Sequence, residues 1–226
     1  MQERGHVHTL RCLLPSHSSI YRPTFLTANL SEATMSCTID NGDSWTSHRH
    51  LWLTITQSAE SWGKHKTFVW TKERSFEDYL GLIALQVNIS HTSIGLLTNS
   101  KDEFDYYRSI LQKHDFAEVN IFLHPGYDHA LSIDRANRHD KDVQTRRRAE
   151  LARPREYLML QSLKLEEHIL WLDADIYYLD RDIVRRMIRH SVESPSNGLL
   201  TARCAGKGID DYDRNAWLGT RQGPRG

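Results

Sequence analysis

The sequence predicts an α/β fold, a three-layer sandwich around a mostly parallel sheet. Short apolar runs alternate with segments of helical period between residues 51 and 123, in the order strand, helix, strand, helix, strand. The length of 226 residues fits one domain, or one domain with a tail. Hydrophobic residues make up 39% of the chain, which is enough for a core over part of its length.

Each element is predicted from its own pattern. Ser75 precedes a helical pattern and can cap it, and Pro154 is expected to divide two helices, because it disfavours a helical residue before it. Ile169–Leu172 is an apolar run that we interpret as a buried inner strand. The expected strands are 51–55, 67–70, 93–97, 119–123, 169–172 and 198–202, and the expected helices are 76–87, 102–113, 157–165 and one that opens at Asp180 or Asp182.

The chain is expected to divide into three parts. Residues 1–50 are dense in Ser, Thr and His and show no sustained period, so we expect a poorly ordered leader. Residues 51–217 carry the predicted elements and form the expected domain. Residues 218–226 are expected to be a flexible tail.

Composition excludes several classes of protein. Lys and Arg number 29, as do Asp and Glu, so the formal net charge is zero, which argues against a general electrostatic grip on nucleic acid or anionic lipid. No stretch approaches the roughly 20 apolar residues that span a bilayer. Three scattered cysteines fit neither a disulfide framework nor a four-cysteine zinc site. No P-loop or serine-hydrolase motif is present.

The main candidate for chemistry is Asp173–Ala174–Asp175, which directly follows the apolar run Ile169–Leu172. Residues i and i+2 of an extended chain point the same way, so both carboxylates can converge beyond the strand. Such hard oxygen ligands suit manganese or magnesium bridged to a diphosphate. The alternative is that the two aspartates only cap a turn.

Two further groups are candidates for binding. Arg153 and Arg155 lie just upstream of the acidic pair and can counter the charge of a diphosphate, although a solvated helix face is the alternative. Asp213, Asn215 and Trp217 can form a sugar-binding rim, and an ordinary packed turn is equally compatible with this pattern.

Three segments together resemble the fungal Anp1/Mnn9/Van1 mannosyltransferases, glycosyltransferase family 62, over about residues 66–217. These segments are Arg147–Leu158, Ile169–Ile176 and Tyr212–Trp217. The resemblance implies a GT-A fold, which is a Rossmann-like sheet, and transfer of mannose from GDP-mannose to a mannan or other glycan.

The resemblance also implies roles for individual residues. It makes Asp173 and Asp175 the ligands of Mn²⁺, with Mg²⁺ possible, and assigns the nucleotide-sugar to Arg153, Arg155, Asn99 and Asp173. It further implies other mannosyltransferase subunits as partners and the Golgi lumen as location, behind a membrane anchor that this sequence does not contain.

The chain departs from the family pattern at Asn99, Pro154 and Glu156 and ends nine residues after Trp217. We therefore expect weak or absent transfer. The alternatives are a non-catalytic subunit of a glycosyltransferase complex and a metal-dependent phosphodiesterase; neutral charge weighs against the latter.

Overall fold

The computed structural model describes residues 9–13, 35–40, 49–66, 71–125, 141–194 and 198–202. The chain divides into two compact units, Met1–Leu179 and Asp180–Gly226. The first unit contains the whole sheet and the predicted acidic pair. No helix in the described ranges is long and apolar enough to cross a membrane.

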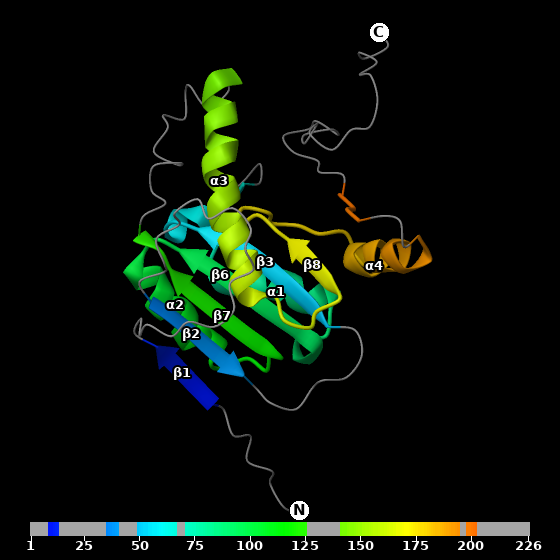
Figure 1. The fold of residues 1–226 in the computed structure, drawn as a ribbon, viewed down its shortest axis with the longest axis horizontal. Coiled ribbons are helices and arrows are strands. Elements are labelled where there is room, and N and C mark those ends of the chain that lie inside the picture. The colour runs from blue at the N-terminus through cyan, green and yellow to red at the C-terminus, as the bar shows by residue number, and fades with distance from the viewer. Residues whose placement is uncertain are drawn as a thin grey trace, which may run out of the picture. The chain divides into compact units, whose positions relative to one another are not determined.

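The first unit is built on a six-stranded sheet in the order β1-β2-β7-β6-β3-β8 (Figure 1). β2 is antiparallel to both of its neighbours, and the other three pairings are parallel. The prediction of a mostly parallel sheet is therefore confirmed. The strands are β1 (Thr9–Leu13), β2 (Met35–Asp40), β3 (His50–Thr56), β6 (Thr92–Thr98), β7 (Glu118–Leu123) and β8 (His168–Trp171).

The strand order contains a reversal of the kind found in Rossmann-like sheets. From β3 the chain moves to β6 and then β7 on one side, and it later returns to place β8 on the other side of β3. The strands that follow β3 in the chain therefore lie on both sides of it, β6 on one side and β8 on the other. In open α/β sheets, ligands bind at such a switch point, beyond the carboxyl ends of the strands.

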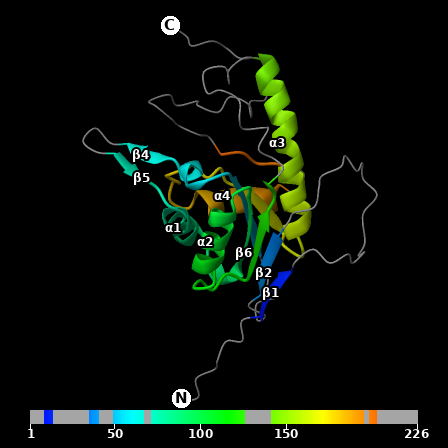
Figure 2. The same cartoon turned by 90° about the vertical axis from the view of Figure 1, so that its left-hand side faces the viewer.

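Helices cover both faces of this sheet, as the three-layer prediction requires. α1 (Phe76–Gln86) and α2 (Lys101–Leu111) lie on one face, and α3 (Lys141–Ser162) lies on the other (Figure 2). α1 begins where predicted, because the Ser75 hydroxyl accepts the Asp78 amide at 3.3 Å while the Asp78 carboxylate accepts the Ser75 amide at 3.0 Å.

Aromatic rings fill the space under α1 and α2. Trp62, from the short 3-10 helix η1 (Ala59–Trp62), packs against Phe76 and Tyr79 with ring centroids 5.2 and 5.1 Å apart. Tyr107 of α2 completes the cluster at 4.6 Å from Phe76, and its hydroxyl lies 2.9 Å from the hydroxyl of Thr56. All four rings are at most 1% exposed, so this face is closed.

The opposite face has an aliphatic core under α3. Leu51 and Leu53 of β3 and Leu158 of α3 are fully buried together. Gly95 of β6 lets α3 approach closely, because a Cβ at this position would lie 2.6 Å from both the Leu53 side chain and the Ser162 hydroxyl. The missing side chain thus sets the spacing between α3 and the sheet.

The structure corrects two predictions near the site. Pro154 does not divide two helices, since α3 runs through it as one helix. The proline removes one hydrogen bond, but it is buried one turn before Leu158 on the same face, and the residues around it favour helix. Ile169–Leu172 is not an inner strand either, because β8 ends the strand order and its residues alternate between half-buried and exposed. A short apolar run does not reveal how many neighbours a strand has.

The sheet extends into the segment that we expected to be a poorly ordered leader. β2 pairs with β7 and buries Cys37 and Ile39, and β1 pairs with β2. In β2 the buried residues Cys37 and Ile39 alternate with Ser36 and Thr38. Two buried positions are too few for this alternation to be recognised in the sequence. Apart from Arg49 and His50, the rest of 1–50 lies outside the described residues, as do 67–70 and 218–226, so those boundaries stay predictions.

The remaining described elements are a hairpin, the short 3-10 helix η2 (Ile89–His91) and one α-helix. β4 (Lys64–Lys66) and β5 (Thr71–Glu73) pair antiparallel. In the second unit, α4 (Ile183–Glu193) begins after Asp182, as predicted, with Asp182 in the left-handed region at φ 62°. Residues 198–202 have no regular structure, so the strand expected there is wrong.

Candidate functional site

The predicted acidic pair lies at the switch point of the sheet. Residues Asp173–Asp175, called the acidic turn below, follow β8 directly, and β8 lies beside β3. The Leu172 amide still donates to the Leu53 carbonyl at 3.2 Å, and the chain then bends, with the Ile176 amide donating to the Asp173 carbonyl at 3.1 Å. Both aspartates are exposed, whereas Ala174 between them is buried. The backbone of the turn is therefore anchored while its carboxylates reach solvent.

A cavity of about 240 Å³ adjoins the acidic turn. The carboxyl end of β3 supplies one wall with two hydroxyls and an amide, and α3 supplies another with an arginine. We call it the switch-point cavity; it is lined by Thr54, Ile55, Thr56, Gln57, Ser61, Leu151, Arg155, Trp171, Leu172 and the acidic turn. Its position and its polar walls suit an anionic ligand such as a diphosphate.

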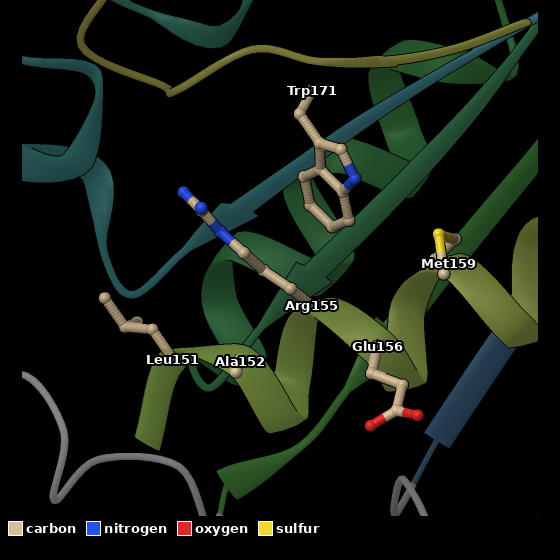
Figure 3. A pocket seen from close by; sticks show the side chains of 6 residues that line it. All are labelled: Leu151, Ala152, Arg155, Glu156, Met159 and Trp171. Carbon is tan, nitrogen blue, oxygen red and sulfur yellow. The ribbon is translucent and has the colours of Figure 1, made fainter. Parts of the chain in front are cut away.

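Arg155 links the acidic turn to α3. Its Nη2 donates to Asp173 Oδ1 at 2.8 Å, and its guanidinium lies 5.5 Å from the centre of the Trp171 ring. Figure 3 shows its side chain extending from α3 past Trp171, while Glu156 points the other way. Arg155 is 46% exposed and Asp173 is 68% exposed on their side chains, so the pair is hydrated and free to exchange partners.

A second, wider cavity of about 500 Å³ shares Leu151, Arg155 and Trp171 with the first. We call it the outer cavity; it is lined by Leu151, Ala152, Arg155, Glu156, Met159 and Trp171 (Figure 3). Both cavities lie between α3 and the end of the sheet, so this side of the molecule is hollowed where the α1 side is filled.

The acidic turn is held on its other side by buried groups. The Thr54 hydroxyl donates to the Leu172 carbonyl at 2.5 Å, and the Tyr79 hydroxyl donates to the same oxygen at 3.4 Å. Burial raises the pKa of Tyr79, so the phenol stays protonated and remains a donor. Arg74 Nη1 donates to the Ala174 carbonyl at 3.4 Å.

Gly63 packs closely against Asp175 of the acidic turn. It has φ +70°, and a Cβ there would lie 3.2 Å from the Cβ of Asp175. The position therefore needs glycine both for its left-handed backbone and for the close approach of Asp175. The Gly63 carbonyl also accepts the Arg74 amide at 3.1 Å, which ties this segment to the start of α1.

The donor set of the acidic turn fits a hard divalent cation only in part. Two carboxylates with oxygen ligands are what magnesium and manganese prefer. Across the described ranges, no three or more His, Cys, Asp or Glu side chains gather to hold a metal by themselves. An ion at Asp173 and Asp175 would therefore need water and ligand oxygens to complete its shell, as such ions commonly do with phosphates.

The structure brings some of the predicted site residues together and leaves others apart. Asp173, Asp175 and Arg155 meet at the switch-point cavity. Arg153 is exposed on α3 and lines neither cavity. Asn99 follows β6 at the same edge of the sheet, half-buried, but does not line either cavity. The predicted rim of Asp213, Asn215 and Trp217 lies outside the described residues.

Sequence reasoning missed the residues that support the turn. Thr54 and Gln57 lie at the end of β3, where a polar run after a strand is a usable signal once β8 is known to be its neighbour. Arg74 is separated from Ala174 by 100 residues, and no local pattern distinguishes it from a surface arginine.

Comparison with known proteins gives two matches. The family model described as Anp1 matches residues 57–225, more than half of the chain. The mannan polymerase complex subunit mnn9 of Schizosaccharomyces pombe is 31% identical over 107 residues, which cover 46% of this chain and 30% of that protein. The chain thus spans less than a third of this relative. No solved structure matches the present chain.

Proposed function

Because the chain belongs to the Anp1 family, we propose that it is a glycosyltransferase that moves mannose from GDP-mannose to a mannan or other glycan acceptor. The observation that carries this proposal is the acidic turn at the β3/β8 switch point, beside a polar cavity. Membership of the Anp1 family supports a function related to glycosyl transfer. The sugar, the nucleotide and the metal dependence are the proposed part.

In this proposal the switch-point cavity receives the diphosphate of the donor. The Ser61 hydroxyl and the Gln57 side-chain amide line this cavity and can donate to the diphosphate oxygens, and Arg155 offers a charged donor. Asp173 would exchange its ion pair with Arg155 for Mn²⁺, or Mg²⁺, which Asp175 would also bind. A bound ion of this kind neutralises the negative charge that develops on the departing diphosphate.

The acceptor is proposed to enter through the outer cavity. That cavity adjoins the switch-point cavity at Leu151, Arg155 and Trp171, so a ligand there would lie next to the donor. A partly exposed tryptophan beside polar side chains is a common surface for a sugar ring. Glu156 adds a carboxylate that can accept hydrogen bonds from sugar hydroxyls.

A second candidate function is that of a non-catalytic subunit in a glycosyltransferase complex. The observation that favours it is the description of the S. pombe relative as a subunit of a mannan polymerase complex. For this chain, assembly with other mannosyltransferase subunits and residence in the Golgi lumen are proposals that extend that description.

Mannose transfer separates the two candidates. The purified chain is incubated with GDP-mannose and short mannosides, with manganese or with a chelator, and extended products are identified by mass. The transferase proposal predicts products with manganese and none with chelator, and their loss in Asp175→Asn. No extended product at any manganese concentration, together with stable association with a second mannosyltransferase, would instead support the subunit role.

A further inference from the structure

Arg74 is a buried cation that the proposed chemistry does not use. It lies between the end of β5 and Ser75, which caps α1, and it is 8% exposed. Arginine is rarely buried to this extent without a specific partner. Burial lowers the pKa of Arg74, while the nearby carboxylates of Asp78 and Asp175 raise it, and the guanidinium stays charged at neutral pH.

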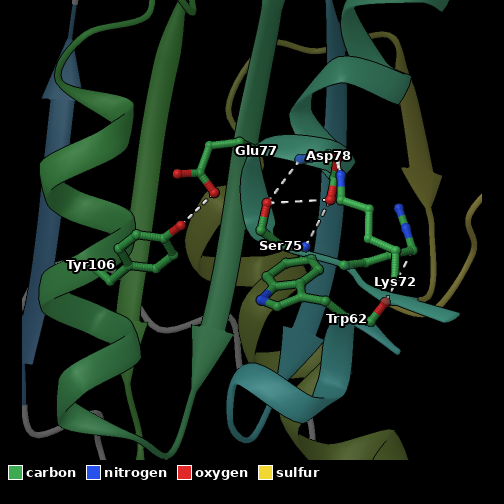
Figure 4. A network of polar contacts seen from close by, with 7 residues as sticks. Trp62, Lys72, Ser75, Glu77, Asp78 and Tyr106 are labelled. Atoms are coloured by element: carbon green, nitrogen blue, oxygen red, sulfur yellow. Dashed lines mark hydrogen bonds and ion pairs between the residues drawn. The ribbon is translucent and has the colours of Figure 1, made fainter. Parts of the chain in front are cut away.

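Both hydrogen-bond partners recorded for its side chain are backbone carbonyls from distant segments. Nη1 donates to the Trp62 carbonyl at 3.2 Å and to the Ala174 carbonyl at 3.4 Å. Figure 4 shows the contact at Trp62 beside the capping network of Ser75 and Asp78. One nitrogen thus joins the end of η1 to the centre of the acidic turn.

The second terminal nitrogen of Arg74, Nη2, gains no hydrogen bond from this placement within the part of the chain that the structure describes. Nη2 is buried and has no hydrogen-bond partner among the described residues. Unsatisfied buried donors are rare in folded proteins, and they are found where a side chain is constrained by another requirement. The requirement visible here is contact with the Ala174 carbonyl.

We propose that Arg74 is a positioning residue for the acidic turn: by holding the Ala174 carbonyl against the end of η1, it directs Asp173 and Asp175 into the switch-point cavity. It acts through the backbone of the turn. Two peptide carbonyls lie between the side chains of Asp173 and Asp175: the Asp173 carbonyl accepts the Ile176 amide, and the Ala174 carbonyl accepts Arg74. With both carbonyls held, the backbone that carries the two aspartates has a defined orientation. The expected consequence, an effect on metal-dependent binding of a nucleoside diphosphate, rests on the proposed function.

The proposal assigns this role to the geometry of the guanidinium and not to its charge alone. Lysine carries the same charge but presents it as a flexible point donor, whereas arginine holds its donors in a rigid plane. Arg74→Lys therefore keeps the cation near Asp175 and loses the defined contact with two carbonyls. Arg74→Gln keeps a planar amide donor and removes the charge. The two variants separate geometry from charge.

The test measures the turn and the ligand separately. Hydrogen exchange follows the Ile176 amide, which bonds the Asp173 carbonyl, and calorimetry follows GDP binding with manganese. Both Arg74→Lys and Arg74→Gln are expected to speed exchange at Ile176 and to weaken manganese-dependent GDP binding by about 10- to 100-fold, the usual effect of losing a support behind a metal ligand. Arg49→Lys is the matched control, since Arg49 is 7% exposed at the amino end of β3. Arg49→Lys should change neither the exchange rate at Ile176 nor the binding of GDP.

Several results would overturn the role of Arg74. Unchanged exchange at Ile176 in both variants would do so, as would full binding by Arg74→Lys with loss only in Arg74→Gln, which would assign the effect to charge. Loss of protection throughout β6 would show a general role in folding. If the unsubstituted chain binds no GDP with manganese, the proposed function fails, and exchange at Ile176 alone decides the role of Arg74.

Discussion

The two faces of the sheet are packed to different extents. Under α1 and α2, Trp62, Phe76 and Tyr107 interlock with almost no exposure. Between α3 and the end of β8, by contrast, two cavities remain and Trp171 is 38% exposed. The acidic turn lies where these regions meet, with its backbone tied to the closed side and its carboxylates open to solvent. A rigid support on one side and open space on the other is what a binding site requires.

The largest predicted difference between the faces is in the free energy of unfolding. Trp62→Ala removes a fully buried ring and should cost about 3–5 kcal/mol. Trp171→Ala should cost only about 1–2 kcal/mol, because the ring is already 38% exposed and borders an open cavity, so the substitution leaves no sealed void. Urea denaturation of both variants measures the two costs. Equal losses would contradict the contrast between a closed and an open face.

Substitutions of glycine test how closely α3 packs against the sheet. Gly95→Ala should lower the free energy of unfolding by about 1–3 kcal/mol, because its Cβ would overlap Leu53 and Ser162. Gly81→Ala is the control: Gly81 is an exposed position of α1 with nothing within 4 Å of the added Cβ. It should raise stability by up to about 1 kcal/mol through helix propensity. Thermal or urea unfolding with no loss for Gly95→Ala would show that α3 adjusts freely.

Gly63 tests the support of the acidic turn from the closed side. Gly63→Ala places a side chain at φ +70° and 3.2 Å from the Cβ of Asp175. We expect a loss of about 1–2 kcal/mol from the left-handed backbone, as well as weaker manganese-dependent GDP binding from the displacement of Asp175. Unfolding and titration on the same preparation measure both effects. Binding that survives intact would show that the position of Asp175 is not set by this contact.

The smallest effect on stability is expected at the open side. Arg155→Ala breaks the ion pair with Asp173, but both side chains are hydrated, so the free energy of unfolding should fall by less than about 1 kcal/mol. GDP binding should nevertheless weaken, since the variant removes a charged donor from the switch-point cavity. A large loss of stability with unchanged binding would reverse the roles that we assign to the two faces.

Local patterns were sufficient to predict the elements that surround the site. The runs at β3, β6 and β7 and the periods of α1 and α2 are strong and uninterrupted, and the cap at Ser75 forms as expected. The acidic turn was found because a carboxylate pair after a strand is a local feature.

The misses arise from relations between distant segments. The edge position of β8 follows from the strand order, which no single segment encodes. Pro154 is accommodated inside α3 because burial against the sheet outweighs one lost hydrogen bond. The contact between Arg74 and Ala174 joins residues that only the completed fold brings together.

The most direct test of the account is a calorimetric titration of the chain with GDP, with and without manganese. The account predicts binding that depends on manganese and that is lost in Asp173→Asn and Asp175→Asn without a change in unfolding, because both side chains are exposed. Asp115→Asn, an exposed aspartate at the amino end of β7, is the matched control and should bind like the unsubstituted chain. Equal GDP affinity in all four proteins, with or without manganese, would contradict the assignment of the acidic turn as the metal and diphosphate site.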